Sequence, residues 1–382
     1  MIPLNRNLNA LNRSPIRVYT NLAKATPGCV NLTIGEPDFD TPENIKAAAL
    51  TALQENKTHY APNQGTEKLR NAIAEKEGVS PSRVLVTVGA CQALFTALLG
   101  ILNPGEEVIV PAPGFVLYES IAAIAGAKVV KLDISGTDFQ ITREALEAAI
   151  TPRTKAILLN SPNNPTGVIL NQQSLDNVAQ AILGKPIFLV LDEVYNKLAY
   201  GPCPSLWGDP RLEEQTILCQ SFSKPWAMTG WRIGYLVCPE YVMDRLLLLS
   251  AANITAVPTF LQEAAVTALE TPVDAMVEVY RKRRDYVCRR LTKMGLTFPK
   301  PEGAFYVFVD IRKFGLTSGE FCTRMIKEAG LAAVPGSCFG VEGYIRLSYC
   351  YSDEELQEGL DRLETFIKTH RTSPHYPVGE GF

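Results

Sequence analysis

Residues 220–232 read Gln220-Ser221-Phe222-Ser223-Lys224-Pro225-Trp226-Ala227-Met228-Thr229-Gly230-Trp231-Arg232. Short apolar runs lie on either side of this stretch, Thr216–Cys219 before it and Ile233–Val237 after it. Two serines, two tryptophans and a methionine surround Lys224, so its amine has little access to water. Desolvation lowers the pKa of a lysine and frees its amine for Schiff-base chemistry. A single lysine is more often a solvated surface charge. The rest of the sequence is therefore needed to distinguish a surface lysine from one that forms a Schiff base.

Short apolar runs alternate with helical patterns between about residues 84 and 240. They are Val84–Val88, Val108–Pro111, Lys128–Leu132, Ala156–Leu159, Ile187–Leu191, Thr216–Cys219 and Ile233–Val237. Runs that are apolar throughout, rather than alternating with polar residues, are typical of strands covered on both faces. The pattern predicts an α/β fold whose large domain holds a seven-stranded, mostly parallel sheet.

Further elements flank this block of strands. Amphipathic helices are expected over Glu43–Glu55 and Thr66–Glu77, and a long helix over Thr271–Met294. A smaller α+β unit follows, with elements at Tyr306–Val309, Ser318–Ala329, Tyr344–Tyr349 and a helix from Asp353. We therefore expect a large cofactor-binding domain, residues 40–280, and a small discontinuous domain, residues 1–39 and 281–382.

The composition narrows the possible functions. The 382 residues include 37 basic and 40 acidic side chains, a balance that argues against a dedicated nucleic-acid or membrane-surface protein. Only three histidines occur, and the nine cysteines include no Cys-x-x-Cys pair, so neither histidine-led catalysis nor a metal site is expected. No apolar run reaches the roughly 18 residues of a membrane span, and the N-terminus lacks the apolar core of a signal peptide. We expect a cytoplasmic protein.

Polar residues follow several of the expected strands, and ligands of open α/β sheets bind at the carboxyl ends of strands. Gly89-Ala90-Cys91 follows the first strand and begins a helix. Free N–H groups at a helix start favour a phosphate, although most such turns only connect two elements. The turn 160–167 contains two prolines and a glycine. It is a rigid connection that would also aim the amide of Asn164 into a pocket.

Asp192 ends another apolar run. A magnesium-binding Walker-B carboxylate would need an upstream G-x-x-x-x-G-K-[ST] loop, which the chain lacks, so Asp192 is expected to be a buried carboxylate that requires a cation. Ser221, Ser223 and Arg232 form a candidate phosphate cradle with the turn 89–91. Pyridoxal phosphate needs a lysine for a Schiff base, a carboxylate for its ring nitrogen, donors for its ring oxygen, and amides with an arginine for its phosphate. The pattern predicts that cofactor.

Six motifs occur in one order between about residues 30 and 350. They are Ile34-Gly35-Glu36-Pro37-Asp38-Phe39, Tyr60-Ala61-Pro62, Asn164-Pro165-Thr166-Gly167, Asp192-Glu193-Val194-Tyr195, Ser221-Phe222-Ser223-Lys224 with Gly230-Trp231-Arg232-Ile233-Gly234, and Arg346-Leu347-Ser348. With them the chain resembles the class I/II aminotransferases, of the fold type I pyridoxal-phosphate-dependent transferases. The resemblance implies a homodimeric enzyme that moves an amino group from an L-amino acid to a 2-oxo acid, with 2-oxoglutarate as the expected acceptor.

The resemblance also implies a role for each motif residue. Lys224 would carry the cofactor as a Schiff base and then move a proton between the substrate and the cofactor. Asp192 would pair with the ring nitrogen, and Tyr195 and Asn164 would donate to the ring oxygen. The phosphate would be held by Gly89, Ala90, Cys91, Ser221, Ser223 and Arg232.

A few residues depend on the resemblance alone. Phe115 would stack on the cofactor, although after Pro-Ala-Pro-Gly it is typical of loop packing. Tyr60 would reach the phosphate in the neighbouring subunit, although by itself it is an ordinary half-buried aromatic. Arg346 would clamp the substrate α-carboxylate beside Gly35 and Asn164, although its strand pattern also suits an exposed edge charge.

The substrate is the open question. The pattern is most similar to the bacterial subgroup of aspartate, aromatic and N-acetyl-diaminopimelate aminotransferases, and nearest to its aminotransferase A branch. Aspartate enzymes of that subgroup often carry a lysine at the turn 89–91, which has none here, so aspartate specificity is not expected. Arg17 is interpreted as a surface charge, with a distal substrate carboxylate as the alternative.

Two other functions are compatible with parts of this pattern. A β-lyase of the C–S lyase type shares the fold, the lysine and the cofactor motifs, and it is the alternative to the aminotransferase. A pyridoxal-phosphate-sensing transcription regulator is disfavoured, because such proteins carry an additional DNA-binding domain and the aminotransferase pattern here begins within about 30 residues.

Overall fold

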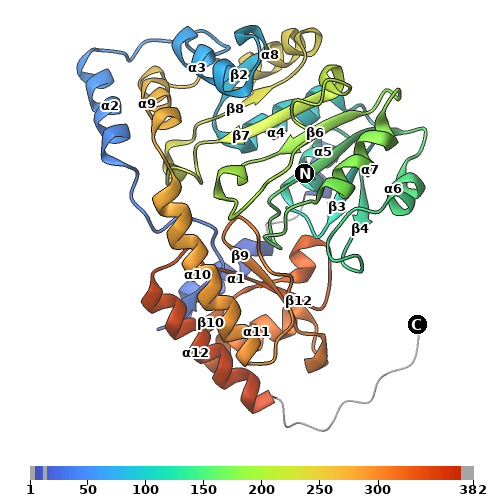
Figure 1. Ribbon diagram of the computed structural model, residues 1–382, viewed down its shortest axis with the longest axis vertical. Helices are drawn as coiled ribbons and strands as arrows, with labels where there is room; N and C mark the ends of the chain where they lie inside the picture. Colours follow the sequence, from blue (N-terminus) through green and yellow to red (C-terminus); the bar gives the residue numbers. More distant parts are fainter. Residues whose placement is uncertain (1–4, 12–14, 371–382) are drawn as a thin grey trace.

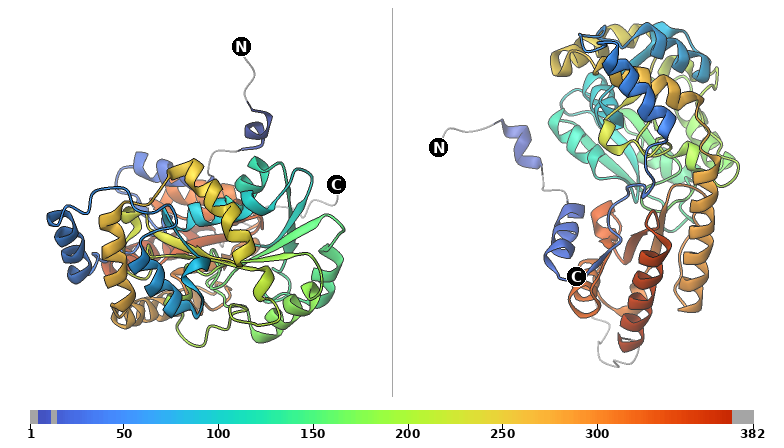
Figure 2. Two further views of the ribbon diagram at one scale, coloured as in Figure 1. Left: turned by 90° about the horizontal axis from the view of Figure 1, so that it is seen from above. Right: turned by 90° about the vertical axis from the view of Figure 1, so that its left-hand side faces the viewer.

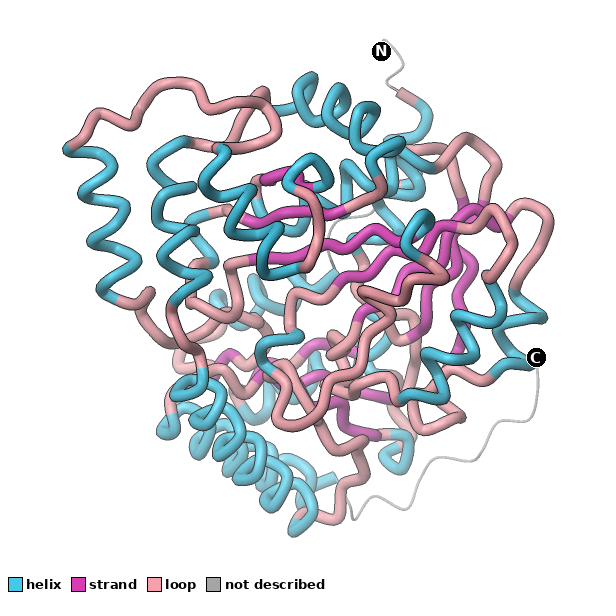
Figure 3. Tube along the Cα trace, turned by 45° about the horizontal axis from the view of Figure 1, so that its top comes forward, coloured by secondary structure: helices cyan, strands magenta, loops and turns pink. Residues whose placement is uncertain are grey.

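The computed structural model describes residues 5–11 and 15–370, which form a larger and a smaller unit (Figure 1). The larger unit is built on a seven-stranded sheet that crosses the molecule (Figure 3). Its strands in spatial order are β2 (Val84–Thr87), β8 (Gly234–Val237), β7 (Thr216–Ser221), β6 (Phe188–Asp192), β5 (Thr154–Asn160), β3 (Glu107–Ala112) and β4 (Lys128–Asp133). All neighbours pair in parallel except β8, which is antiparallel to β2 and β7. The prediction of a seven-stranded, mostly parallel sheet is confirmed.

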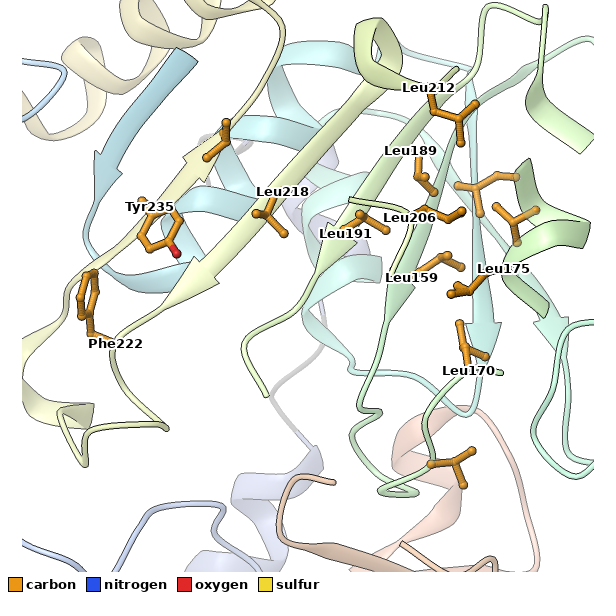
Figure 4. Close-up of a cluster of buried hydrophobic side chains, with 14 of the residues drawn as sticks. Leu159, Leu170, Leu175, Leu189, Leu191, Leu206, Leu212, Leu218, Phe222 and Tyr235 are labelled. Carbon is orange, nitrogen blue, oxygen red and sulfur yellow. The ribbon is translucent and has the colours of Figure 1, made fainter. Parts of the chain in front are cut away.

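Helices cover both faces of this sheet. Because strand side chains alternate between faces, Leu158 and Val190 point into one core. Leu159, Leu189 and Leu191, which Figure 4 labels, point into the other. The first core is closed by α4 (Gly89–Ile101), α5 (Leu117–Ile124) and α8 (Glu240–Ile254). The second core is closed by α2 (Glu43–Gln54), α3 (Glu67–Glu77), α6 (Arg143–Ala149), α7 (Gln172–Ile182) and α9 (Thr259–Glu270).

The smaller unit combines segments from both ends of the described chain. Its antiparallel sheet has the order β11 (Val334–Pro335), β12 (Tyr344–Ser348), β9 (Tyr306–Asp310), and a second, parallel pair joins β1 (Val30–Asn31) to β10 (Leu331–Ala332). Around these strands lie α1 (Pro15–Ala25), α11 (Ser318–Ala329) and α12 (Asp353–His370). The 3₁₀ helices of the described residues, in both units, are Arg6–Ala10, Pro81–Arg83, Asn196–Leu198, Glu213–Gln215, Thr229–Trp231, Arg312–Phe314 and Gly336–Phe339.

The long helix α10 (Asp274–Lys293) runs beside both units (Figure 2, right). It begins three residues later than the sequence pattern predicted, because Pro272 disfavours a helical conformation at Thr271. It ends before Gly295, whose φ of 70° stops the helix as expected. Tyr280 and Leu291 of this helix pack into the core of the smaller unit. The division into residues 40–280 and residues 1–39 with 281–382 stays a proposal.

Among residues 5–11 and 15–370, no helix combines the length and the apolar character that a membrane crossing requires.

Candidate active site

A cavity of about 510 Å³ lies at the carboxyl ends of the sheet strands, where the smaller unit meets them. Nearly all the residues predicted from the sequence line it: Gly35, Ala90, Cys91, Phe115, Asn164, Asp192, Tyr195, Ser221, Ser223, Lys224, Arg232 and Arg346. Gly89 is buried just behind the wall, where a Cβ atom would lie 2.7 Å from a terminal nitrogen of Arg232. Tyr60 lies elsewhere, with its side chain 92% exposed. The structure therefore brings together the predicted residues with the exception of Tyr60.

Lys224 follows β7 in a loop and is half-buried. Its Nζ donates a hydrogen bond of 2.6 Å to the carbonyl oxygen of Gly35 and lies 5.9 Å from the ring centre of Phe305. Desolvation lowers the pKa of this amine, as the apolar surroundings in the sequence predicted. Gly35 can pack directly against Tyr306 because it has no side chain: a Cβ atom at this position would lie 1.8 Å from the hydroxyl oxygen of Tyr306.

Asp192 is the last residue of β6 and only 3% exposed. The Tyr118 hydroxyl donates to its Oδ2 over 2.6 Å, and the N–H of Val194 donates to its Oδ1 over 3.4 Å. No basic side chain within the described parts of the chain forms an ion pair with it. Burial without a cation raises the pKa of the Asp192 carboxyl to about 6. The site thus contains a carboxylate that lacks its counter-charge.

Arg346 supplies a buried cation in the same cavity. It is 2% exposed, and its guanidinium lies 4.5 Å from the ring centre of Tyr306. One terminal nitrogen donates to Oδ1 of Asn164 over 2.8 Å and the other donates to the carbonyl oxygen of Thr33, while Nε has no partner among the described atoms. A buried guanidinium that meets only neutral acceptors is suited to an anion. The alternative of an exposed edge charge is wrong, because β12 carries Arg346 into the interior.

A fourth charged group, Arg232, lies next to the first turn of α4. Its backbone is left-handed, with φ of 55°, and one terminal nitrogen donates to the carbonyl oxygen of Thr229 over 3.0 Å. The first turn of α4 packs directly against β8 at Gly234, because this residue has no side chain. A Cβ atom there would lie 2.9 Å from the backbone nitrogen of Ala90. The N–H groups of this helix start and the Arg232 side chain form a cationic corner that suits a phosphate.

These groups fit pyridoxal phosphate. The carboxylate of Asp192 lacks a cation, which a protonated ring nitrogen provides. Lys224 is the desolvated amine, and the corner at Arg232 takes the phosphate. Tyr195 also lines the cavity, and its hydroxyl lies 2.8 Å from the hydroxyl of Tyr306, a hydrogen bond in which either oxygen can be the donor.

The sequence reading missed several residues of the cavity. Tyr118 follows Phe115 by three positions at the start of α5, and this spacing was an available signal for a shared face. Tyr306 offered no local signal, because its contact with Tyr195 joins two distant segments. Helix α1 also lines the cavity, through Ile16, Thr20, Asn21 and Lys24, which the sequence did not indicate. Arg17 of the same helix is exposed, as expected of a surface charge, and it also lines the cavity.

Comparison with known proteins gives consistent matches. A model of the family "aminotransferase class I and II" matches residues 27–363. The probable N-acetyl-LL-diaminopimelate aminotransferase of Bacillus subtilis is 41% identical, with 96% of each chain covered. The aromatic-amino-acid aminotransferase 2 of Thermococcus litoralis is 40% identical, covering 96% of this chain and 98% of the other. The solved aspartate aminotransferase of Thermus thermophilus with maleate superposes with a TM-score of 0.91, at 38% identity, over 96% of this chain and all of the other.

Proposed function

The chain belongs to the aminotransferase class I and II family, and from that premise we propose that its cavity moves an amino group from an L-amino acid to 2-oxoglutarate, with Lys224 as the reacting lysine. Membership makes the protein a pyridoxal-phosphate-dependent aminotransferase of fold type I, as the sequence motifs predicted. One observation carries the proposal for the site. A desolvated lysine, a carboxylate without a cation and a buried arginine without an anion line the same cavity.

The residues that would hold the cofactor follow from their charges. Asp192 would pair with the ring nitrogen, and the hydroxyl of Tyr118 keeps this carboxylate in place. Tyr195 and Asn164 would donate to the ring oxygen. Because Oδ1 of Asn164 accepts from Arg346, its NH₂ group remains available as a donor. The ring would stack on Phe115, and the phosphate would be held by Gly89, Ala90, Cys91, Ser221, Ser223 and Arg232.

The chemistry is divided between the cofactor and the chain. When bound, pyridoxal phosphate supplies an aldehyde carbon for the amino group and a ring that stabilises negative charge at the substrate Cα. Arg346 would bind the α-carboxylate through two parallel hydrogen bonds, beside Gly35 and Asn164, and so fix the orientation of the Cα–H bond. The Nζ of Lys224 would take the proton from Cα and return it at the neighbouring carbon. A low pKa suits Nζ for this role, because the amine must be neutral to accept a proton.

We expect stopped-flow spectroscopy to show both half-reactions. An amino donor should remove the visible absorption of the bound cofactor, and 2-oxoglutarate should restore it without a second donor. The donor panel should include N-acetyl-LL-diaminopimelate, aromatic amino acids, glutamate and aspartate, because relatives at 38–41% identity are named for several of these substrates. Steady release of pyruvate and ammonia from cystathionine, with no requirement for an oxo acid, would instead support the alternative, a β-lyase. A chain that responds to no donor would contradict the proposal.

We also propose a homodimer in which Tyr60 reaches the cofactor phosphate of the second copy. The support is that Tyr60 is almost fully exposed and lies outside the cavity that the other cofactor residues line. Sedimentation should show a dimer at micromolar concentration, and Tyr60→Phe should weaken retention of the cofactor during dialysis without dissociating the dimer. A monomer that retains full activity would contradict this proposal. The cytoplasmic location stays a prediction.

A further inference from the structure

Two tyrosine hydroxyls meet in the cavity, one from each unit of the molecule. Tyr195 follows β6 of the larger unit, and Tyr306 is the first residue of β9 in the smaller unit. Their oxygens lie 2.8 Å apart, and both side chains are buried. Within residues 5–11 and 15–370, each hydroxyl has the other as its only hydrogen-bond partner. The proposed function uses Tyr195 and leaves Tyr306 without a role.

The hydroxyl of Tyr306 is held in place by its surroundings. Strand β9 pairs with β12 so that Phe308 lies opposite Arg346. Tyr306 is two residues from Phe308 and therefore on the same face of β9, which makes Arg346 its diagonal neighbour. The Arg346 guanidinium accordingly lies 4.5 Å from the ring centre of Tyr306. The backbone of Gly35 also packs against the hydroxyl and leaves no room for a Cβ atom. The oxygen of Tyr306 therefore has a fixed position.

The direction of the hydrogen bond between the two tyrosines decides whether Tyr195 can serve the cofactor. A phenol has one proton to donate. If Tyr195 gave its proton to Tyr306, none would remain for the ring oxygen of the cofactor. If Tyr306 is the donor, the proton of Tyr195 is free to point into the cavity. The proposed role of Tyr195 therefore requires Tyr306 to donate.

The charge beside Tyr306 favours this second direction. Burial raises the pKa of Tyr306 to about 12, and the cation of Arg346 opposes that rise. Burial raises the pKa of Tyr195 well above its ordinary value, and the neighbouring Tyr306 raises it further. Of two phenols, the one with the lower pKa is the stronger donor. The position of Arg346 against the ring therefore favours Tyr306 as the donor of the pair.

We propose that Tyr306 is a positioning residue, which donates to Tyr195 and so turns the proton of Tyr195 toward the ring oxygen of the cofactor. Successive hydrogen bonds strengthen one another, so Tyr195 also becomes a stronger donor. Tyr306 acts through Tyr195 and needs no contact with the reacting atoms. This inference rests on the proposed function and assigns a further residue to it.

Tyr306→Phe tests the proposal, because it removes the hydroxyl and keeps the ring beside Arg346. The visible absorption of the cofactor linked to Lys224 should titrate at a higher pH in this variant. A weaker hydrogen bond from Tyr195 leaves the charge on the ring oxygen less stabilised, so the link to Lys224 holds its proton more tightly. Loss of one neutral hydrogen bond corresponds to a rise of about 0.5 to 1 in that pKa. Absorption spectra recorded through the pH titration measure the change.

Cofactor binding gives a second readout that does not depend on activity. The apoenzyme can be titrated with pyridoxal phosphate and with 3-deoxypyridoxal phosphate, which lacks the ring oxygen. Tyr306→Phe should lose about three- to tenfold in affinity for the first and almost none for the second. Tyr349→Phe is the matched control, because its hydroxyl belongs to another tyrosine pair, 3.2 Å from that of Tyr200, and does not line the cavity. The control should leave both affinities and the absorption unchanged.

Tyr195→Phe shows whether Tyr306 acts through Tyr195. In a chain that already lacks the Tyr195 hydroxyl, Tyr306→Phe should change neither the pKa of the absorption nor the ratio of the two affinities. A further change in this double variant overturns the proposal, because Tyr306 would then act by another route.

The remaining outcomes separate this inference from the proposed function. An unchanged pKa and affinity in Tyr306→Phe overturns the inference, as does an equal loss of affinity for both cofactors. If Tyr306→Phe does not fold, replacement of Tyr306 by 3-fluorotyrosine provides the test. This more acidic phenol should lower the pKa of the absorption, and no change or a rise overturns the inference. A wild-type chain that does not bind pyridoxal phosphate overturns the proposed function, and the inference with it.

Discussion

Lys224→Ala should lose nearly all turnover, by about 10⁴-fold or more, because it removes both the covalent link to the cofactor and the proton carrier. The visible absorption that depends on the lysine link should disappear from the purified protein. Single-turnover assays with the best donor from the panel measure the first effect, and the spectrum of the reconstituted variant measures the second. Circular dichroism and the melting temperature should show a folded protein, since a half-buried cation is replaced by a small apolar side chain.

Lys197→Ala is the matched control for this variant. Desolvation also lowers the pKa of Lys197, and its ammonium lies 5.6 Å from the ring centre of Trp226, yet it does not line the cavity. The control should keep the wild-type spectrum and turnover. Full activity in Lys224→Ala would refute the assignment of the reacting lysine, whatever the control shows.

Asp192→Asn should reduce kcat by about 10²- to 10³-fold, because an amide cannot balance the charge of a protonated ring nitrogen. Loss of one partner of a buried ion pair costs about 3 kcal/mol or more, and each factor of ten in rate corresponds to about 1.4 kcal/mol. Cofactor affinity should fall as well, which titration of the apoenzyme with pyridoxal phosphate measures.

Asp192→Asn should stabilise the fold of the apoenzyme, although it impairs catalysis and cofactor binding. Burial raises the pKa of Asp192 to about 6 from the usual value of 3.8, so ionising this carboxyl destabilises the fold. That penalty is absent below about pH 4 and complete above about pH 6. The apo form of Asp192→Asn should therefore melt at a higher temperature than wild type at pH 7.5, and the difference should vanish near pH 4.

Glu193→Gln provides the control for the loss of kcat. Glu193 is the neighbouring buried carboxyl, and desolvation raises its pKa to about 7, but its hydrogen bonds go to Ser205 and Asn196 and it does not line the cavity. It should change kcat little. Equal losses of kcat in the two variants would mean that charge near β6, rather than a pair with the cofactor, is what the enzyme needs.

The positions of Asp192, Asn164 and Lys224 could be predicted from the sequence, and the reason is geometric. Asp192 ends a buried strand, Asn164 and Lys224 each lie a few residues after one, and parallel strands end at one edge of their sheet. Residues far apart in the chain therefore meet there without any further information about packing. The motifs around these residues also identified the family and its cofactor before the fold was known.

The small unit's contribution to the cavity could not be predicted in the same way. Arg346 enters the interior because β12 lies between β9 and β11, and the hydroxyl of Tyr306 meets Tyr195 only after the two units pack together. Tyr118 reaches Asp192 because α5 packs on the sheet beside β6. The spacing of Phe115 and Tyr118 indicates a shared face, but the partners in these contacts lie far apart in the sequence and no local pattern joins them.

The sequence by itself determined which segments form strands, which cofactor the protein uses and which residues lie at the strand ends. Hydrophobic periodicity and short motifs are local properties of the sequence, so they can be recognised without the fold. Only the tertiary structure decided which charges stay uncompensated. Arg17 has the same sequence surroundings whether it faces solvent or substrate, and the packing of Leu22 and Ala23 on the smaller unit selects the cavity. The aminotransferase chemistry could therefore be predicted from the sequence, whereas the presence of Arg17 at the cavity depends on how α1 packs on the smaller unit.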